Sequence, residues 1–346
     1  MDKMRIVGGR PLKGKVRVGG AKNAALPILI SSLLTGGKCR FGRVPELHDI
    51  RTCLKILEHM GVKANWDLAH ESVTLDASGI TTREAPYDLV RTMRASVVVL
   101  GPLLARFGEA KVSLPGGCAI GARPIGFHLS GLEKLGAQID LEGGYVIAKA
   151  SKLVGNRVVF EIPSVCATEN LMIAATLARG ESILENCAKE PEIVDLARTL
   201  RAMGAELEGE GTETISIQGK SSLQGCEHQI MGDRIEAGTF LAGALATRGD
   251  VTVEGVAPEY LEAVLVKFEE AGAAVERGPD SIRVVGKCRP MGVDFTTLPY
   301  PGFPTDMQAQ LMAALMGADG TSMISETIFE NRFMHVPELC RLGADI

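Results

Sequence analysis

The hydrophobic pattern of the chain is clearest between residues 238 and 285. A nearly uninterrupted apolar run, Gly238 to Ala246, predicts a helix that is buried on most sides. The segment Val251 to Glu254 predicts a short strand, and Tyr260 to Ala271 has apolar residues at helical spacing with charges between them. Alternation in Ala274 to Glu276 and in Ile282 to Val285 predicts two paired strands. This region therefore predicts an α/β unit with one buried and one amphipathic helix.

The end of the amphipathic helix recurs along the chain as an apolar residue, a glycine and a small or apolar residue. Consecutive glycines of this pattern are separated by 68 to 75 residues. They are Gly61, Gly136, Gly204, Gly272 and Gly343. A glycine just past a helix is a typical stop because it enters the left-handed conformation without a steric penalty. The sequence thus predicts five repeats of about 70 residues, the fifth reaching Ile346 before its last strands.

The ends of several elements are also marked. Asp233 to Glu236 has the form of a capping box, and Glu190 to Glu192 places a proline in the first turn of a helix. Arg5 to Val7 predicts an N-terminal strand. Because the N-terminus shows no apolar signal core, we expect a cytosolic protein.

Composition narrows the class of protein. The chain has 346 residues, of which 46% are hydrophobic and 23% charged, so it can bury a large core and is long enough for two domains. A net charge of -5 argues against nucleic acid or an anionic membrane as the main partner. The longest apolar runs, Ala24 to Leu34 and Ala95 to Ala105, are too short to span a bilayer. The eight cysteines form no C-x-x-C pair and no cluster at metal-ligand spacing, so we expect neither a metal nor disulfides.

Cys118 lies in the glycine-rich segment Leu114 to Pro124, where neighbouring glycines leave room to present the sulfur to a ligand. A thiol titrates near a pH of about 8.5, so at neutral pH it can donate a proton, and its thiolate can add to a substrate. The alternative is a small buried side chain in a turn. We interpret the other cysteines as packing residues: Cys39, Cys53, Cys166, Cys187, Cys226, Cys288 and Cys340. His128 is expected to be a hydrogen-bonded structural histidine, without a proton-transfer role.

Charged residues at predicted helix starts are further candidates. Lys22 and Asn23 precede an apolar helix, where the helix N-terminus and the ammonium group would both favour an anion; the alternative is a solvated lysine. Asp306 either accepts a proton or caps the predicted helix Met307 to Met316. Asp233 and Arg234 either face a ligand or form a cap and a surface ion pair.

Five dispersed motifs resemble one enzyme family, in a single register along the whole chain. They are Gly20 to Ala24, Thr92 to Ser96, Leu114 to Pro124, Phe303 to Gln308 and Glu330 to His335. The family is the enolpyruvyl transferases that act on UDP-N-acetylglucosamine. The resemblance implies an α/β fold of two domains, each an inside-out α/β barrel with its helices inside, built from repeats of about 70 residues.

The same resemblance implies how the domains are composed. Residues 22–231 would form a continuous domain with three repeats and the cysteine loop, and residues 1–21 with 232–346 would form the second. A substrate cleft would lie between the domains, with hinge crossings that let them close. A sixth repeat would complete the second domain, which is therefore expected to be incomplete here.

The activity implied is transfer of the enolpyruvyl group of phosphoenolpyruvate to the 3-hydroxyl of UDP-N-acetylglucosamine, with release of phosphate. This is the first committed step of cytoplasmic peptidoglycan synthesis, and hence of cell-wall growth, cell shape and division, and it is inhibited by fosfomycin. The two partners implied are the small-molecule substrates, and no cofactor is implied.

The resemblance also implies roles for individual residues. Cys118, Asp306 and Lys22 would be catalytic, with Cys118 donating a proton or adding covalently and Asp306 accepting the proton of the sugar hydroxyl. Lys22 and Asn23 would hold phosphoenolpyruvate, and Arg123 would lie over the same anion or the UDP phosphates. Contacts to the UDP-sugar would come from Arg94, Arg123, Pro124, Ile125, Gly126, Phe127, Ser164, Val165, Asp306 and Ile328.

The sequence departs from the family pattern at two places, and three alternative functions stay open. Ile162 to Val165 stands where several relatives carry a lysine, and a family arginine that grips phosphoenolpyruvate lies in the sixth repeat. One alternative is the shikimate-pathway enolpyruvyl transferase, which lacks the cysteine loop. A second is a truncated, catalytically silent protein that still binds UDP-sugar. A third is a thiol hydrolase built on Cys118 and His128.

Overall fold

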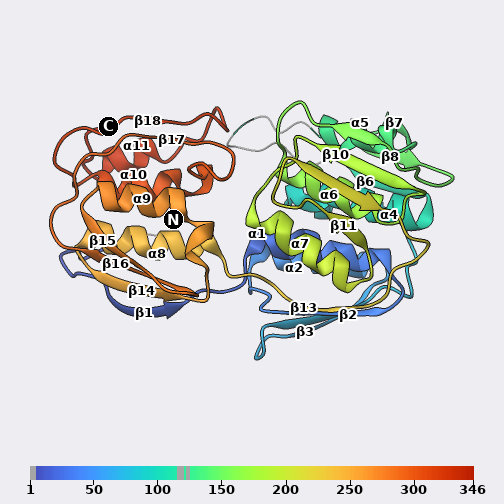
Figure 1. Cartoon of the computed structure of the whole chain (residues 1–346), viewed down its shortest axis with the longest axis horizontal. Helices are drawn as coiled ribbons and strands as arrows, with labels where there is room; N and C mark the ends of the chain where they lie inside the picture. The colour runs from blue at the N-terminus through green and yellow to red at the C-terminus, as the bar shows by residue number, and fades with distance from the viewer. Residues whose placement is uncertain (1–4, 115–120, 122–124) are drawn as a thin grey trace. The chain divides into compact units, whose positions relative to one another are not determined.

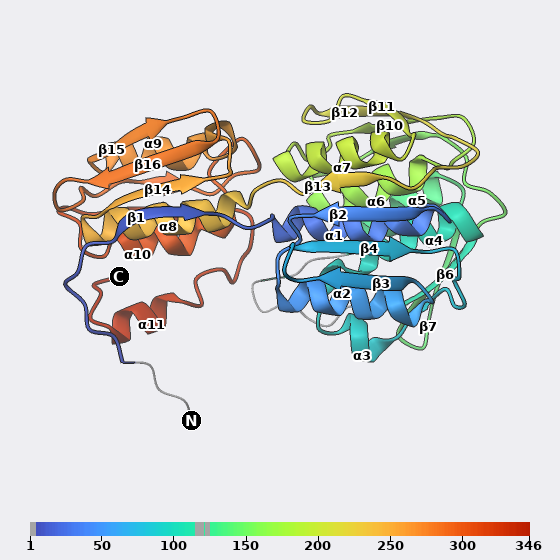
Figure 2. The ribbon, with the colours of Figure 1, turned by 90° about the horizontal axis from the view of Figure 1, so that it is seen from below.

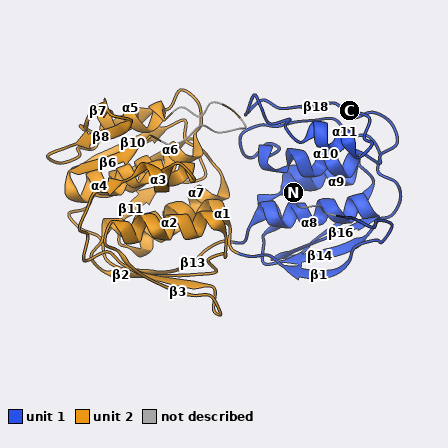
Figure 3. Cartoon of the chain, turned by 180° about the vertical axis from the view of Figure 1, so that it is seen from behind, with its two compact units in different colours: residues 1–19, 232–346 blue, residues 20–231 orange. Residues whose placement is uncertain are grey.

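The computed structural model describes residues 5–114, 121 and 125–346 of the chain (Figure 1). The backbone divides into two compact units (Figure 3). Unit 1 consists of Met1–Gly19 and Gly232–Ile346, and unit 2 consists of Gly20–Met231. Each unit has a hydrophobic core of its own.

The described part of unit 2 contains three four-stranded sheets with one topology. In the spatial order of each sheet the first strand is parallel to the second, the second is antiparallel to the third, and the third is antiparallel to the fourth. The first sheet has the order β13 (Glu227–Gln229), β2 (Lys38–Gly42), β4 (Ser72–Asp76), β3 (Lys63–Asp67). The second has the order β5 (Glu84–Ala85), β6 (Glu109–Ser113), β8 (Tyr145–Lys149), β7 (Gln138–Glu142). The third has the order β9 (Arg157–Val159), β10 (Glu181–Glu185), β12 (Thr214–Gln218), β11 (Glu206–Glu208).

The helices of unit 2 differ in burial as the sequence predicts. They are α1 (Lys22–Ser31), α2 (His48–His59), α3 (Tyr87–Val90), α4 (Leu100–Phe107), α5 (Gly126–Lys134), α6 (Val165–Ala175) and α7 (Pro191–Ala202), with 3-10 turns η1 (Ser32–Leu34) and η2 (Arg94–Val99). Helices α1, α4 and α6 bury nearly all their side chains, whereas α2 and α7 expose a charged face. Figure 1 shows α1 and α2 covering one face of the first sheet. The interior of the unit is therefore helical.

Unit 1 repeats the same sheet topology. Its four-stranded sheet has the order β1 (Lys13–Arg17), β14 (Asp250–Glu254), β16 (Ser281–Gly286), β15 (Ala273–Arg277). A parallel pair follows, β17 (Phe295–Thr296) and β18 (Ile324–Ser325). Its helices are α8 (Arg234–Thr247), α9 (Glu262–Glu270), α10 (Gln308–Leu315) and α11 (Val336–Arg341), with 3-10 turns η3 (Pro258–Tyr260) and η4 (Thr305–Met307).

Two sheets take their parallel edge strand from a distant part of the chain (Figure 2). Strand β13 lies beside β2, with Glu227 opposite Arg40. Strand β1 lies beside β14, with Lys13 opposite Asp250. Each of these two pairings joins segments about two hundred residues apart in the sequence.

The repeat predicted from the glycines is confirmed. All five of the glycines that end the second helices adopt φ angles between 93° and 101°, the left-handed region that side chains with a Cβ disfavour. Pro191 occupies the first turn of α7 as expected. The elements predicted between residues 238 and 285 are present as α8, β14, α9, β15 and β16.

Two expectations are wrong. Arg5 to Val7 forms no strand, and Ile6 and Val7 are 77% and 82% exposed, so they bury no apolar surface that would favour a strand; the first strand is β1. The cysteines expected to pack are buried at Cys39, Cys53, Cys187 and Cys226 but exposed at Cys166, Cys288 and Cys340. Cys288 lies between Lys287 and Arg289 and Cys340 precedes Arg341, whereas Cys166 is exposed although apolar residues flank it on both sides.

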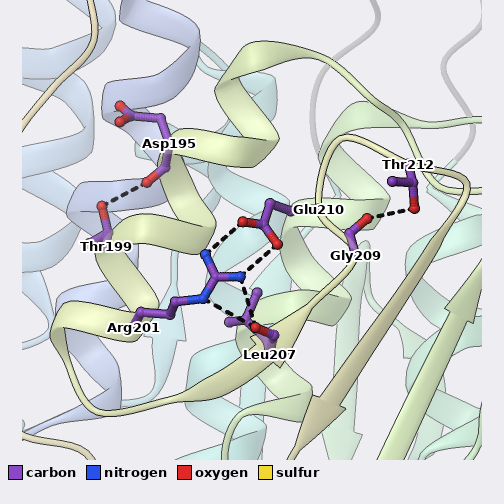
Figure 4. Close-up of polar contacts among 7 residues, drawn as sticks. All are labelled: Asp195, Thr199, Arg201, Leu207, Gly209, Glu210 and Thr212. Atoms are coloured by element: carbon purple, nitrogen blue, oxygen red, sulfur yellow. Dashed lines mark hydrogen bonds and ion pairs between the residues drawn. The ribbon is translucent and has the colours of Figure 1, made fainter.

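The C-terminus of α7 is fixed to the following turn by Arg201 (Figure 4). Its guanidinium donates to the carbonyl of Leu207 from Nε at 3.1 Å and from Nη2 at 2.8 Å. It also donates to both carboxylate oxygens of Glu210 at 2.6 Å. This fork holds β11 against the helix that precedes it.

In the ranges that the structure describes, no helix combines the length and the apolar character needed to cross a bilayer.

Candidate functional site

Asp306 lies in the 3-10 turn η4 of unit 1 and is half-buried. Its Oδ1 accepts a hydrogen bond from Nη2 of Arg332 at 2.6 Å. Helix α10 has Met307 as its N-cap residue, so Asp306 does not occupy the N-cap position that the sequence analysis considered for it. The carboxylate is instead held by a charge-assisted hydrogen bond from a loop that follows β18.

Arg332 is the site residue that the sequence analysis missed. It lies in the motif Glu330 to His335 quoted above, but no role was assigned to it. Its guanidinium lies over the ring of Phe329, 5.6 Å from the centroid, as well as on Asp306. An arginine inside a motif that resembles the family was the signal that could have identified it.

Ile328 belongs to the same loop. Its backbone N–H donates to Oε1 of Glu326 at 2.8 Å. A contact from the Ile328 backbone to a sugar would therefore fall to its carbonyl oxygen. Glu326 also had no assigned role in the sequence analysis.

Lys22 is the first residue of α1 in unit 2, two residues before the predicted start of that helix. Its Nζ lies 3.2 Å from Oδ2 of Asp49, which comes from the first turn of α2. The side chains of Lys22 and Asp49 are 40% and 33% exposed, so the ammonium group is ion-paired but open to solvent on one side. Asn23 is exposed beside it. The helix N-terminus and this ammonium group together favour an anion.

Arg94 begins η2 and is half-buried, and its charge acts on His128 in α5. Burial, and to a lesser degree the Arg94 charge, lower the pKa of His128 from 6.5 to about 3. Nδ1 of His128 accepts from the Asn170 amide at 3.0 Å, and the Asn170 oxygen accepts from the Gly101 N–H at 2.9 Å. His128 is thus a buried neutral histidine, as expected, and a weak base with one nitrogen engaged. This argues against the thiol hydrolase.

The uncharged residues of unit 2 that were predicted to contact the UDP-sugar would do so through backbone groups rather than through their side chains. Ile125, Phe127 and Val165 pack against the core of the unit. Gly126 is the exposed first residue of α5, and Ser164 precedes α6 in an extended conformation. The carbonyls of Ile125 and Ser164 accept hydrogen bonds from N–H groups of the helices that follow, so the backbone N–H groups at these two helix starts are the better candidates for contact with a nucleotide.

Asp233 caps helix α8, accepting from the N–H groups of Ile235 at 2.8 Å and Glu236 at 3.0 Å. In a capping box the Glu236 carboxylate would accept from the N–H of the cap residue, Asp233. Here it accepts instead from the N–H of Gly19 at 2.8 Å. Arg234 is buried, with its guanidinium 5.8 Å from the centroid of the Tyr300 ring, and so does not lie on the surface.

The remaining candidates, Cys118, Arg123 and Pro124, lie outside the described residues. Among the residues that are described, no group of three or more histidine, cysteine, aspartate or glutamate side chains is arranged to hold a metal ion.

Comparison with known proteins places the chain in a family. The model of the EPSP synthase family (3-phosphoshikimate 1-carboxyvinyltransferase) matches residues 6–346. UDP-N-acetylglucosamine 1-carboxyvinyltransferase from Thermodesulfovibrio yellowstonii is 54% identical over 347 aligned positions, which cover 100% of this chain and 83% of that protein.

Solved structures show the same fold. The enolpyruvyl transferase NikO from Streptomyces tendae matches with a TM-score of 0.85 at 24% identity, covering 97% of this chain and 80% of that one. EPSP synthase from Acinetobacter baumannii matches with a TM-score of 0.69 at 23% identity, covering 92% of this chain and 74% of that one. The fold predicted from the sequence is therefore confirmed. The chain belongs to the enolpyruvyl transferases and, within them, to the UDP-N-acetylglucosamine 1-carboxyvinyltransferases.

Proposed function

We propose that this protein transfers the enolpyruvyl group of phosphoenolpyruvate to the 3-hydroxyl of UDP-N-acetylglucosamine and releases inorganic phosphate. The observation that carries the proposal is 54% identity along the entire chain to a relative of that activity. Both substrates are metabolites of the cytosol, where we place the reaction. The product would commit the UDP-sugar to peptidoglycan.

The reaction proceeds by addition and then elimination. The sugar oxygen forms a bond to C2 of phosphoenolpyruvate while the double-bond electrons take up a proton at C3. The C2–O bond to phosphate then breaks, phosphate leaves with the electron pair, and C3 loses a proton to regenerate the double bond. The protein must supply an acid, a base and cations for a substrate with a phosphate and a carboxylate.

In this scheme Asp306 accepts the proton of the sugar hydroxyl. Its Oδ1 is held at 2.6 Å by Arg332, which fixes the direction of the carboxylate. Cys118 donates the proton to C3 or adds covalently to C2, because a thiol is mostly protonated at neutral pH and its thiolate is a strong nucleophile.

The anionic substrates are bound mainly by basic groups. Lys22 and the N-terminus of α1 hold phosphoenolpyruvate together with Asn23, and the ion pair with Asp49 holds the Lys22 ammonium group in position. Arg123 contributes a second cation. The UDP-sugar is held by Arg94, by the backbone of Pro124 to Phe127 and of Ser164 to Val165, and by the carbonyl of Ile328.

The shikimate-pathway reaction is the second candidate, because the matching family model carries that name. Identity separates the two: 54% to the UDP-sugar enzyme against 23% to an EPSP synthase of solved structure. The glycine-rich segment with Cys118 also argues against it.

The test is phosphate release by the purified chain with phosphoenolpyruvate and each acceptor separately. We expect release with UDP-N-acetylglucosamine and none with shikimate 3-phosphate. Asp306→Ala should lower kcat by about 10²-fold or more, the scale of a positioned proton acceptor. Cys118→Ala should lose turnover while still binding UDP-sugar. Release with shikimate 3-phosphate alone would overturn the proposal, and binding of UDP-sugar without any turnover would favour the catalytically silent alternative.

A further inference from the structure

We propose that Glu326 is a positioning residue for this reaction: its carboxylate holds the turn that carries Asp306 and the loop that carries Ile328 in one fixed arrangement. The inference rests on the proposed function, in which Asp306 is the base. Glu326 itself is not placed in contact with substrate.

Glu326 follows strand β18 directly and is half-buried. Its carboxylate accepts four hydrogen bonds from three separate segments. Oε1 accepts from Thr297 Oγ1 at 2.8 Å, from the N–H of Ile328 at 2.8 Å and from the N–H of Phe329 at 3.1 Å. Oε2 accepts from Thr305 Oγ1 at 2.9 Å. One side chain thus ties together the end of β17, the start of η4 and the loop after β18.

The Thr297 contact is itself held in place. Thr297 is fully buried, and its N–H donates to the carbonyl of Ser325 at 2.9 Å. The N–H of Thr327 donates to Thr297 Oγ1 at 3.0 Å. That oxygen accepts a hydrogen bond from Thr327, and the Thr297 hydroxyl donates its own proton to Glu326 because a carboxylate oxygen can only accept.

Two paths lead from Glu326 to Asp306. The first is short, since Thr305 is the residue before Asp306 and its hydroxyl is anchored to Oε2. The second runs through the loop: Phe329 is anchored by its N–H, its carbonyl accepts from the N–H of Arg332 at 3.2 Å, and Arg332 grips Asp306. Glu326 therefore controls both the backbone position of Asp306 and the arginine that orients its carboxylate.

The chemistry of the four partners predicts how substitutions behave. All four are neutral donors, so the role requires acceptor oxygens in two positions rather than a negative charge. In Glu326→Gln the amide oxygen can take the place of Oε1, and the amide NH2 can donate to Thr305, whose hydroxyl can rotate to accept. Glu326→Ala removes every anchor and leaves two backbone N–H groups without their partner. Thr305→Val removes only the first path, the hydrogen bond from the Thr305 hydroxyl to Oε2, and keeps the path through Phe329 and Arg332.

The experiment measures kcat, both KM values and amide hydrogen exchange for Glu326→Gln, Glu326→Ala and Thr305→Val. We expect Glu326→Gln to keep kcat within about 3-fold and Thr305→Val to lower kcat by about 5-fold with an unchanged KM for UDP-sugar, as expected for one lost hydrogen bond. Glu326→Ala should lower kcat by about 10²-fold and speed exchange at Ile328 and Phe329. Glu338→Ala on α11, an exposed glutamate of the same unit, is the control and should match wild type.

Several results would overturn the proposal. One is Glu326→Ala with wild-type kcat and wild-type exchange. A second is Thr305→Val that lowers only the melting temperature, since a merely structural threonine would not change kcat of the folded enzyme. If Glu326→Ala does not fold, Glu326→Gln and Thr305→Val still test the proposal. Full activity in Asp306→Ala would instead refute the assignment of Asp306 as the base. Even then, faster amide hydrogen exchange in Glu326→Ala but not in Glu326→Gln would support the anchoring role of the Glu326 side chain.

Discussion

Replacing His128 by glutamine should change how the stability of unit 2 depends on pH. The folded protein holds the pKa of His128 at about 3, against 6.5 for the ordinary group, mainly by burial. Between these values the unfolded chain binds a proton that the folded chain does not, so stability falls as the pH falls from 6.5 towards 3. A single group of this kind removes about 1.4 kcal/mol per pH unit inside that window, or about 2 kcal/mol between pH 7.5 and 5.

Glutamine keeps a neutral acceptor for the Asn170 amide but cannot take up the proton. His128→Gln is therefore expected to be less stable than wild type at pH 7.5, because the packing is poorer, and to close the gap by about 2 kcal/mol at pH 5. Urea unfolding can be followed by the fluorescence of Trp66, the single tryptophan, which lies in β3 of the same unit. Stability curves that stay parallel from pH 7.5 to 5 would refute the reasoning. Because burial is the larger cause, the effect should persist in high salt.

Three further predictions test the binding site, the fold and the thiols. Lys22→Gln should raise the KM for phosphoenolpyruvate by about 10-fold or more, the cost of one charged hydrogen bond, while Lys15→Gln should not; a change confined to the KM for UDP-sugar would contradict the assignment. Arg201→Gln should lower the free energy of unfolding by about 1 kcal/mol at neutral pH. Because the Arg201 hydrogen bond lowers the pKa of Glu210, that loss should shrink as the pH falls below 4.5, the ordinary value of the carboxyl group; in urea titrations an equal loss at neutral pH and well below 4.5 would count against this contact. Under native conditions an alkylating reagent should label the exposed thiols and spare the buried ones, as mass mapping would show: Cys166, Cys288 and Cys340 labelled, Cys39, Cys53, Cys187 and Cys226 protected.

The features of the fold that follow from local chemistry were predictable from the sequence. A glycine after an amphipathic helix needs only its own backbone freedom to end that helix, and all five such glycines adopt the left-handed conformation. Pro191 can start α7 because the N–H groups of a first turn have no partner within the helix, so the N–H that proline lacks is not needed there. The apolar composition of α6 similarly sufficed to predict its burial.

The features that depend on distant partners were not predictable. Asp306 looks like a cap in sequence, but the structure gives it Arg332, 26 residues further along the chain. Glu326 carries no motif of its own, and its role appears only when Thr297 and Thr305 are brought to it. Burial of a thiol likewise depends on what covers it, which is why Cys166 and Cys187 differ although each is followed by an alanine.

The pairing of β1 with β14 has a consequence for synthesis on the ribosome. Lys13 leaves the exit tunnel long before its partner Asp250 exists, and at the usual rate of 5–20 residues per second the wait is about 10 to 50 s. During that time β1 is an unpaired strand that a second nascent chain could capture. Its sequence, Lys-Gly-Lys-Val-Arg, puts three cations in five residues, and like charges repel a second copy of the same strand. The basic character of β1 thus protects the nascent chain from aggregation until residue 254 has been made, and neutral β-branched residues in place of these cations would remove that protection.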